Sequence, residues 1–351
     1  MLLRSTIAFA ILGLAACTDD TTTEDSGITG CDIDIREHFP EADSVSAYYL
    51  NPIEFHLSQP HDEDATITVD GVNGTVSWND ERTKIYFDHD GLAPATSYSA
   101  TLSYCRGDAT INFTTSELGN ALDTDVAGKT YSIDLSTGRI VVPEGVGAAL
   151  APYLEFEILA AVKEIQGTDL VITGAIGDED NPGNQDFCSP TFEFPAADFS
   201  GSPYFQLGPQ TTTIAVAGYS VTIDDLLISG TFAPDGSYFG GGTLSGLIDT
   251  RPLVELVFDD EDDENAICDF ILGFGVSCVA CPNGDGDFCL ELKAIDLLAE
   301  ELAITVDDIE YEDCHEECVD TWTDTGALTN PECDLEATGT TSTSGTTTTG
   351  G

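Results

Sequence analysis

Short segments in which apolar and polar residues alternate recur through this chain and restrict what it can fold into. In residues 53–57, Ile53, Phe55 and Leu57 point to one face of an extended segment, because successive side chains of a strand point to opposite faces. Turn-forming Asp-Gly and Asn-Gly pairs separate such segments, at residues 70–71, 73–74 and 90–91. Many short strands with turns between them predict an antiparallel β-sandwich over residues 31–117.

The N-terminus predicts export and a lipid anchor. One basic residue, Arg4, precedes an apolar run over residues 5–16 that ends in Leu14-Ala15-Ala16-Cys17. This run is about half the ~20 residues that a spanning helix needs, so it reads as a signal peptide. The arrangement resembles a bacterial lipoprotein signal. That resemblance implies diacylglycerol and palmitate on Cys17 and a location at the outer membrane or cell surface. The alternative is an ordinary cleaved signal with a chance cysteine.

The cysteine count predicts an oxidised fold. Setting aside the lipidated Cys17 leaves ten of the eleven cysteines, and an even number in an exported chain indicates disulfides. The ten are Cys31, Cys105, Cys188, Cys268, Cys278, Cys281, Cys289, Cys314, Cys318 and Cys333. Cys31 and Cys105 are the two cysteines of the first region, so we expect them to pair with each other. Among the other eight no connectivity is assigned, and structural disulfides are favoured over a zinc half-site or redox pair at Cys278-x-x-Cys281.

The charge of the chain excludes some partners. Ten basic residues stand against 64 acidic ones, for a net charge of −54. Binding of nucleic acid through its phosphates needs clustered Lys and Arg, and docking on anionic headgroups needs basic segments. We therefore expect no nucleic-acid partner, and membrane attachment through covalent lipid alone. The acidity indicates either a solvated surface suited to high salt or calcium binding, and its spread along the whole chain favours the first.

The predicted fold class is all-β in five segments. A signal peptide over residues 1–16 precedes the lipidated cysteine and flexible tether at 17–30, followed by the β-sandwich at 31–117. Residues 118–335 form a disulfide-rich, mostly β domain, either a sandwich or a barrel, with one or two short helices. Of these helices, 267–280 is the strongest candidate and 145–154 a weaker one, and 302–311 is expected to be a strand. A Thr/Gly-rich disordered tail occupies residues 336–351.

One motif in the first region is more specific. Leu92-x-Pro94-x-Thr96-x-Tyr98 predicts a tyrosine corner, in which the Tyr98 hydroxyl turns back to the preceding backbone. With the closing Phe113-Thr114-Thr115, the stretch resembles the bacterial Ig-like domains of S-layer proteins of the SbsA type. The second region resembles uncharacterised myxobacterial lipoprotein domains, which implies no activity.

An acidic loop is the candidate metal site. Asp178, Asp180, Asn181 and Asp186 place oxygens around a turn, and oxygen ligands suit calcium. The loop lacks the twelve-residue EF-hand pattern, and a solvated loop is the favoured alternative. No other cofactor is expected.

Catalytic motifs are missing from the sequence, so we expect no enzymatic activity and no catalytic residues. There is no Gly-x-Ser-x-Gly elbow, no His-Glu-x-x-His and no phosphate-binding loop. Asp224-Asp225, and Asp249 with Arg251, favour surface or structural ion pairs over acid–base groups. Gly240-Gly241-Gly242 favours a bulge or close backbone packing.

Three functions remain open from the sequence. The first is a non-enzymatic, lipid-anchored envelope protein whose Ig-like spacer presents a binding or adhesion domain, with a surface protein or a glycan as ligand. The second is an envelope carrier that holds a lipid or other apolar ligand in a β-barrel. The third is a hydrolase whose active site the motifs do not reveal.

Overall fold

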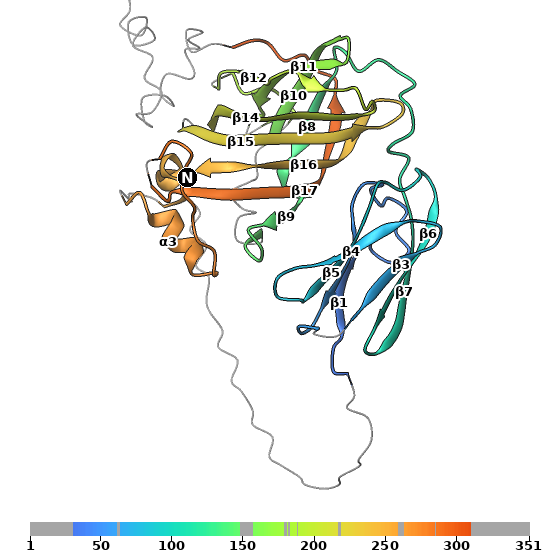
Figure 1. The fold of residues 1–351 in the computed structure, drawn as a ribbon. Coiled ribbons are helices and arrows are strands. Elements are labelled where there is room, and N and C mark those ends of the chain that lie inside the picture. The colour runs from blue at the N-terminus through green and yellow to red at the C-terminus, as the bar shows by residue number, and fades with distance from the viewer. Residues whose placement is uncertain are drawn as a thin grey trace, which may run out of the picture.

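The computed structural model describes residues 31–309, apart from 62–63, 148–156, 179–180, 182, 188, 217–218, 259–262 and 285. A β-sandwich comes first in the chain, and a larger β-sheet that closes on itself follows it (Figure 1). The predicted all-β class is confirmed, and the alternatives left open for the second region are resolved in favour of a barrel. No helix among the described residues is long and apolar enough to cross a membrane.

Two antiparallel sheets form the sandwich. One has the order β1(Ile35–Phe39), β2(Ile53–Leu57), β5(Lys84–His89), β4(Gly74–Trp78), and the other β3(Thr66–Val69), β6(Ser97–Tyr104), β7(Gly107–Thr114). Alternate residues of each strand face inward, as the sequence pattern predicts. They form a core that includes Ile53, Phe55, Ile85, Leu102 and Phe113.

The predicted tyrosine corner is present. The Tyr98 hydroxyl accepts a hydrogen bond from the backbone N–H of Ala93 at 2.8 Å, and Leu92 is buried. The ring of Tyr98 stacks on Phe113 with centroids 5.9 Å apart. A disulfide joins Cys31 to Cys105, which ties the segment before β1 to the end of β6.

The barrel closes because β10 pairs with strands on both of its sides. Antiparallel pairing runs from β10 through β8, β17, β16, β15, β14, β13 and β11, and β11 pairs back with β10. Two further strands lie off this ring, β9 against β17 and β12 against β11. The strands are β8(Thr130–Asp134), β9(Arg139–Val142), β10(Glu157–Gln166), β11(Asp169–Ile176), β12(Phe192–Glu193), β13(Ala197–Asp198), β14(Tyr204–Val216), β15(Tyr219–Phe232), β16(Tyr238–Asp249) and β17(Cys289–Leu302).

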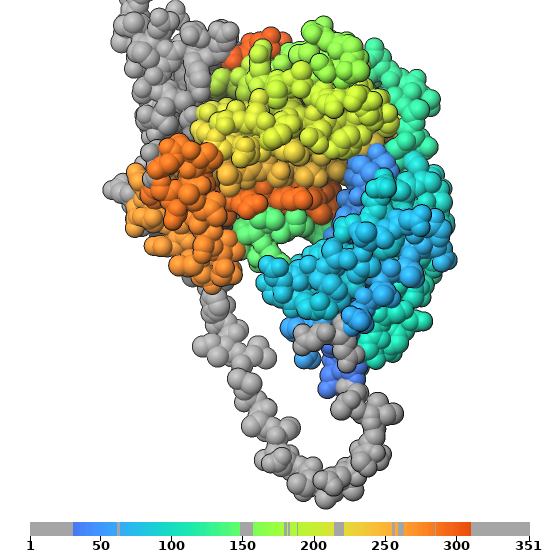
Figure 2. Space-filling view, in the orientation of Figure 1, coloured from blue at the N-terminus to red at the C-terminus, as the bar shows by residue number. Residues whose placement is uncertain are grey.

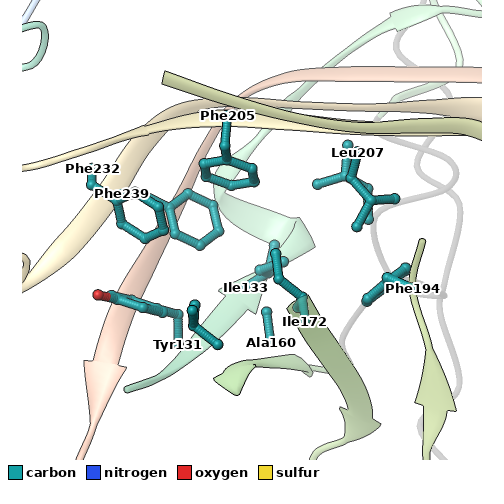
Figure 3. Close-up of a pocket in the computed structure, with 11 residues that line it drawn as sticks. Tyr131, Ile133, Ala160, Ile172, Phe194, Phe205, Leu207, Phe232 and Phe239 are labelled. Atoms are coloured by element: carbon teal, nitrogen blue, oxygen red, sulfur yellow. The ribbon is translucent and has the colours of Figure 1, made fainter. Parts of the chain in front are cut away.

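Aromatic side chains fill the barrel interior (Figure 3). The ring of Phe232 lies 5.0 Å from Phe205, 5.3 Å from Tyr131 and 5.7 Å from Phe239, measured between centroids. The apolar cavity beside them measures about 10 Å³, roughly the space for one water-sized probe. The barrel therefore has a packed core at this place, not a ligand chamber.

Helices are short and lie outside the barrel wall. Within the described ranges they are the 3₁₀ turns η1(Leu135–Thr137) and η3(Arg251–Leu253) and the α-helices α2(Val254–Val257) and α3(Ala266–Leu272). The predicted helix at 267–280 is wrong beyond Leu272, because Gly275 has a positive φ of 84° and a disulfide from Cys268 to Cys278 turns the chain back. The predicted strand at 302–311 is also wrong over its described part, since β17 ends at Leu302 and 303–309 form no strand. The helix candidate at 145–154 falls mostly outside the described residues.

The aromatic core generates a stability prediction. Phe232→Ala should lower the free energy of unfolding by about 3–5 kcal/mol, because truncating a buried Phe removes transfer energy and leaves a cavity. The matched control is Phe274→Ala, since Phe274 is 51% exposed and should cost under about 1 kcal/mol. Urea unfolding followed by far-UV circular dichroism measures both. Equal losses in the two variants would contradict the packed core.

Candidate functional site

Polar groups from the sandwich and the barrel meet at one place, which we call the junction. Its sandwich residues are Tyr48, Asn51 and Glu54, and its barrel residues are Arg139 of β9 and Asp296 of β17. Figure 2 shows the sandwich, in blue and cyan, lying against the green-to-orange barrel. Nothing in the sequence patterns singled out these residues.

The centre of the junction is an ion pair between Arg139 and Glu54. Two guanidinium nitrogens of Arg139 donate to the two carboxylate oxygens of Glu54, at 3.2 and 3.0 Å. Glu54 is 5% exposed, and the guanidinium carbon lies 3.7 Å from the centroid of the Phe39 ring. Bidentate geometry and stacking on an aromatic face are the arrangements in which Arg binds most strongly.

The surroundings of Glu54 hold it in the ionised form. Burial opposes ionisation, but hydrogen bonds from His56, at 2.9 Å, and from Arg139 outweigh it and lower the pKa of Glu54 to about 2. Burial also lowers the pKa of Arg139, but Glu54 and Asp296 outweigh it, and the net change is upward. Burial and the charge of Glu54 raise the pKa of Tyr86 to about 12. The Arg139–Glu54 pair is therefore charged at neutral pH, and Glu54 has no proton to donate.

Three more contacts surround this pair. The Tyr48 hydroxyl hydrogen-bonds the Thr231 hydroxyl at 2.7 Å, Asn51 donates to the carboxylate of Asp296, and Lys84 lies 2.7 Å from Glu144. Each contact joins a residue of the sandwich to a residue of the region that forms the barrel. The junction thus combines two ion pairs with two hydrogen bonds.

A glycine notch in the barrel accepts the Tyr48 ring. Gly241 has a φ of +59°, and a Cβ there would lie 2.3 Å from ring atoms of Tyr48. The pairing of β16 with β17 shifts register on both sides of Gly242. The bulge and close packing predicted for Gly240-Gly241-Gly242 are therefore both present, and the close packing is against the sandwich.

Between described cysteines the structure has three disulfides. They join Cys31 to Cys105, Cys268 to Cys278 and Cys281 to Cys289. Cys278 and Cys281 thus belong to different disulfides, so they form neither a zinc half-site nor a redox pair. Cys17, Cys188, Cys314, Cys318 and Cys333 lie outside the described residues, as do the tether and the C-terminal tail.

The candidate calcium loop is described only in part. Asp178 accepts a hydrogen bond from the backbone N–H of Asn181 at 2.7 Å, and Asp186 accepts one from Ser189 at 2.6 Å. Asp180 lies outside the described residues. Within the part of the chain that the structure describes, no group of three or more His, Cys, Asp or Glu is placed to hold a metal ion. Calcium binding remains a prediction.

The other acidic candidates have structural roles. Arg251 and Asp249 form a bidentate ion pair, at 2.9 and 2.6 Å. Asp224 accepts a hydrogen bond from Thr211 at 2.6 Å, and Asp225 adopts a φ of +52° where the pairing of β15 with β16 shifts register. These residues do not converge on the junction.

Comparison with known proteins gives distant structural neighbours. No family profile and no curated protein match the chain. An L,D-transpeptidase from Mycobacterium smegmatis and the LD transpeptidase LdtMt1 in complex with imipenem are each 10% identical over 56% of this chain, covering 76% and 75% of theirs, with TM-scores of 0.22. The S-layer protein rSbsC(31-844) is 11% identical over 76% of this chain and 53% of its own, with a TM-score of 0.17. Similarity at this level carries no argument about activity, ligand or partner.

One prediction from the sequence is not upheld, the expected absence of enzymatic activity. The sequence predicted that the chain is not an enzyme, and two of the solved structures similar to it are enzymes. Activity depends on sites carried by a fold and not on the fold itself. The missing catalytic motifs therefore do not establish that the chain lacks activity, and that prediction is withdrawn.

The lowered pKa of Glu54 generates a pH prediction. Because the pKa falls from 4.5 to about 2 on folding, the ionised pair stabilises the fold fully above about pH 4.5, and this contribution, about 3 kcal/mol, is lost as the pH falls towards 2. Glu54→Gln should remove this step and lower stability at pH 7 by about 3 kcal/mol, because it removes the bidentate partner of the half-buried Arg139, which keeps Asp296 alone.

Denaturant unfolding between pH 2 and 7 measures the effect, with Glu37→Gln as the matched control. Glu37 lies 3.2 Å from His56, but its side chain is 59% exposed. Its loss should change stability by less than about 1 kcal/mol. An unchanged pH profile in Glu54→Gln would show that the pair does not stabilise the fold.

Proposed function

We propose that this protein is a lipid-anchored component of the bacterial cell envelope, in which the sandwich and the barrel act as one rigid unit that presents a binding surface. The observation that carries the proposal is the junction. The bidentate Arg139–Glu54 pair and the Tyr48 ring packed against Gly241 fix the barrel on the sandwich. A unit of this kind keeps a binding surface on one part in a constant orientation relative to the other part.

The lipid anchor is inferred from the sequence. Leu14-Ala15-Ala16-Cys17 supplies the site for lipid, and residues 18–30 supply a polar tether. A flexible chain of thirteen residues reaches roughly 20 Å. The acidic chain gains nothing from electrostatic attraction to an anionic membrane, so the acyl chains on Cys17 provide the attachment.

The packed barrel favours presentation over carriage. A carrier needs a cavity that holds most of its ligand, commonly about 300–1,000 Å³ for a small molecule. The apolar cavity inside the barrel measures about 10 Å³, and the rings of Phe205, Phe232 and Phe239 occupy the place of a ligand. A lipid chain could enter there only if these side chains moved.

Metabolic labelling tests the lipid anchor. In bacteria that express the full chain and are fed an alkyne analogue of palmitate, the protein should carry the label and sediment with membranes. Cys17→Ser should remove the label and release the protein into the soluble fraction, because a thiol at this position is the acceptor. An unlabelled wild-type protein, or equal labelling of Cys17→Ser, would contradict the proposal.

A further inference from the structure

A polar groove runs across the outer face of the sheet β3-β6-β7. Its floor consists of two hydrogen-bonded cross-strand pairs. The hydroxyls of Ser97 and Thr114 lie 2.9 Å apart, and Ser99 donates to Oδ1 of Asn112 at 2.7 Å. The same strands continue beyond the groove with two more such pairs, Thr101–Thr110 and Ser103–Asp108.

The two walls of the groove come from different segments. The backbone N–H of Asp43 donates to the carbonyl of Asn112 at 2.6 Å, so residues 43–44 lie along the outer edge of β7. On the opposite side, the N–H of Asp70 donates to the carbonyl of Ser99 at 3.1 Å. Three interstrand steps of about 4.8 Å separate these walls by roughly 14 Å. The groove between them has a volume of about 400 Å³.

The chemistry of the groove selects a neutral ligand rich in hydroxyl groups. Each wall carries one carboxylate, Asp43 or Asp70, and no basic side chain lines the groove among the described residues. Anionic ligands are therefore repelled. The two carboxylates cannot bind one calcium ion together, because calcium ligands lie within about 2.6 Å of the ion and the walls are about 14 Å apart.

Donors and acceptors for a polyol are both present. The wall carboxylates accept hydrogen bonds, the floor hydroxyls can do either, and Asn112 keeps the hydrogens of Nδ2 for a ligand, since its pairing with Ser99 uses Oδ1. The Ser44 hydroxyl, also on the lining, is buried without a hydrogen-bond partner.

We propose that this groove binds a neutral saccharide. Asp43 and Asp70 accept hydrogen bonds from sugar hydroxyls, and Asn112 donates to a sugar oxygen. The inference rests on the proposed surface-binding role and decides between its two classes of ligand in favour of a glycan. A protein strand cannot add to β7 beside the groove, since residues 43–44 already occupy that edge.

The position of the groove fits this role. Strands β6 and β7 lie on the side of the sandwich away from β9, as Figure 1 shows. The junction uses Glu54 of β2, in the other sheet. The groove therefore stays open while the sandwich is docked on the barrel, and the sandwich is a binding element as well as a spacer.

Affinity gel electrophoresis of the purified full chain tests the proposal. The gels contain dextran, mannan or xylan, and alginate serves as the anionic control. Wild-type protein should be retarded by at least one neutral polymer and not by alginate. Asn112→Ala and Asp70→Asn should each weaken the apparent affinity at least tenfold. Thr110→Ala, in the same sheet but outside the groove, should leave the affinity unchanged.

Three results would overturn the proposal. They are no retardation by any of the three neutral polymers, unchanged binding by Asn112→Ala, and an equal loss in Thr110→Ala. Circular dichroism of each variant confirms that it is folded. Labelling at Cys17 does not depend on the groove, so a failure of saccharide binding is distinguishable from a failure of the lipid anchor.

Discussion

The ion pair between Arg139 and Glu54 is the interaction on which the arrangement of this protein depends. A chain with a net charge of −54 gives both the sandwich and the barrel acidic surfaces, which repel each other. Two of the ten basic residues, Lys84 and Arg139, bridge the two parts. Arg139 does so in a half-buried, bidentate and aromatic-stacked geometry, where solvent screens its charge less than at a fully exposed site. Two of the few basic side chains thus lie where they offset the repulsion between the sandwich and the barrel.

The barrel and sandwich divide their roles according to where their polar groups lie. The barrel buries aromatic rings around Phe232 and has a packed interior, so its inner surface offers little room to a ligand. The sandwich presents hydroxyl and amide groups on the outer face of one sheet and docks through the other. Docking and ligand binding can therefore occur at the same time on opposite sides of the sandwich.

Much of the fold could be predicted from the sequence, and the junction could not. Alternation in Ile53-Glu54-Phe55 correctly places Glu54 on the outer face of its strand, but the pattern carries no information on what covers that face. The tyrosine corner at Tyr98 was predictable because all its parts lie within a few residues. Barrel closure was not, since it pairs Thr130 with Leu302. Helix α3 is shorter than predicted because a disulfide joins Cys268 to Cys278. The spacing of the cysteines in the sequence does not determine which of them pair.

A double-mutant cycle on the junction tests the central claim most directly. The free energy of unfolding would be measured at pH 7 for the wild type, Glu54→Gln, Arg139→Gln and the double variant. If the pair couples sandwich to barrel, the double variant loses less stability than the sum of the single variants, with a coupling energy of about 2 kcal/mol or more. Additive losses, within about 0.5 kcal/mol, would show that the two side chains do not interact and would contradict the account.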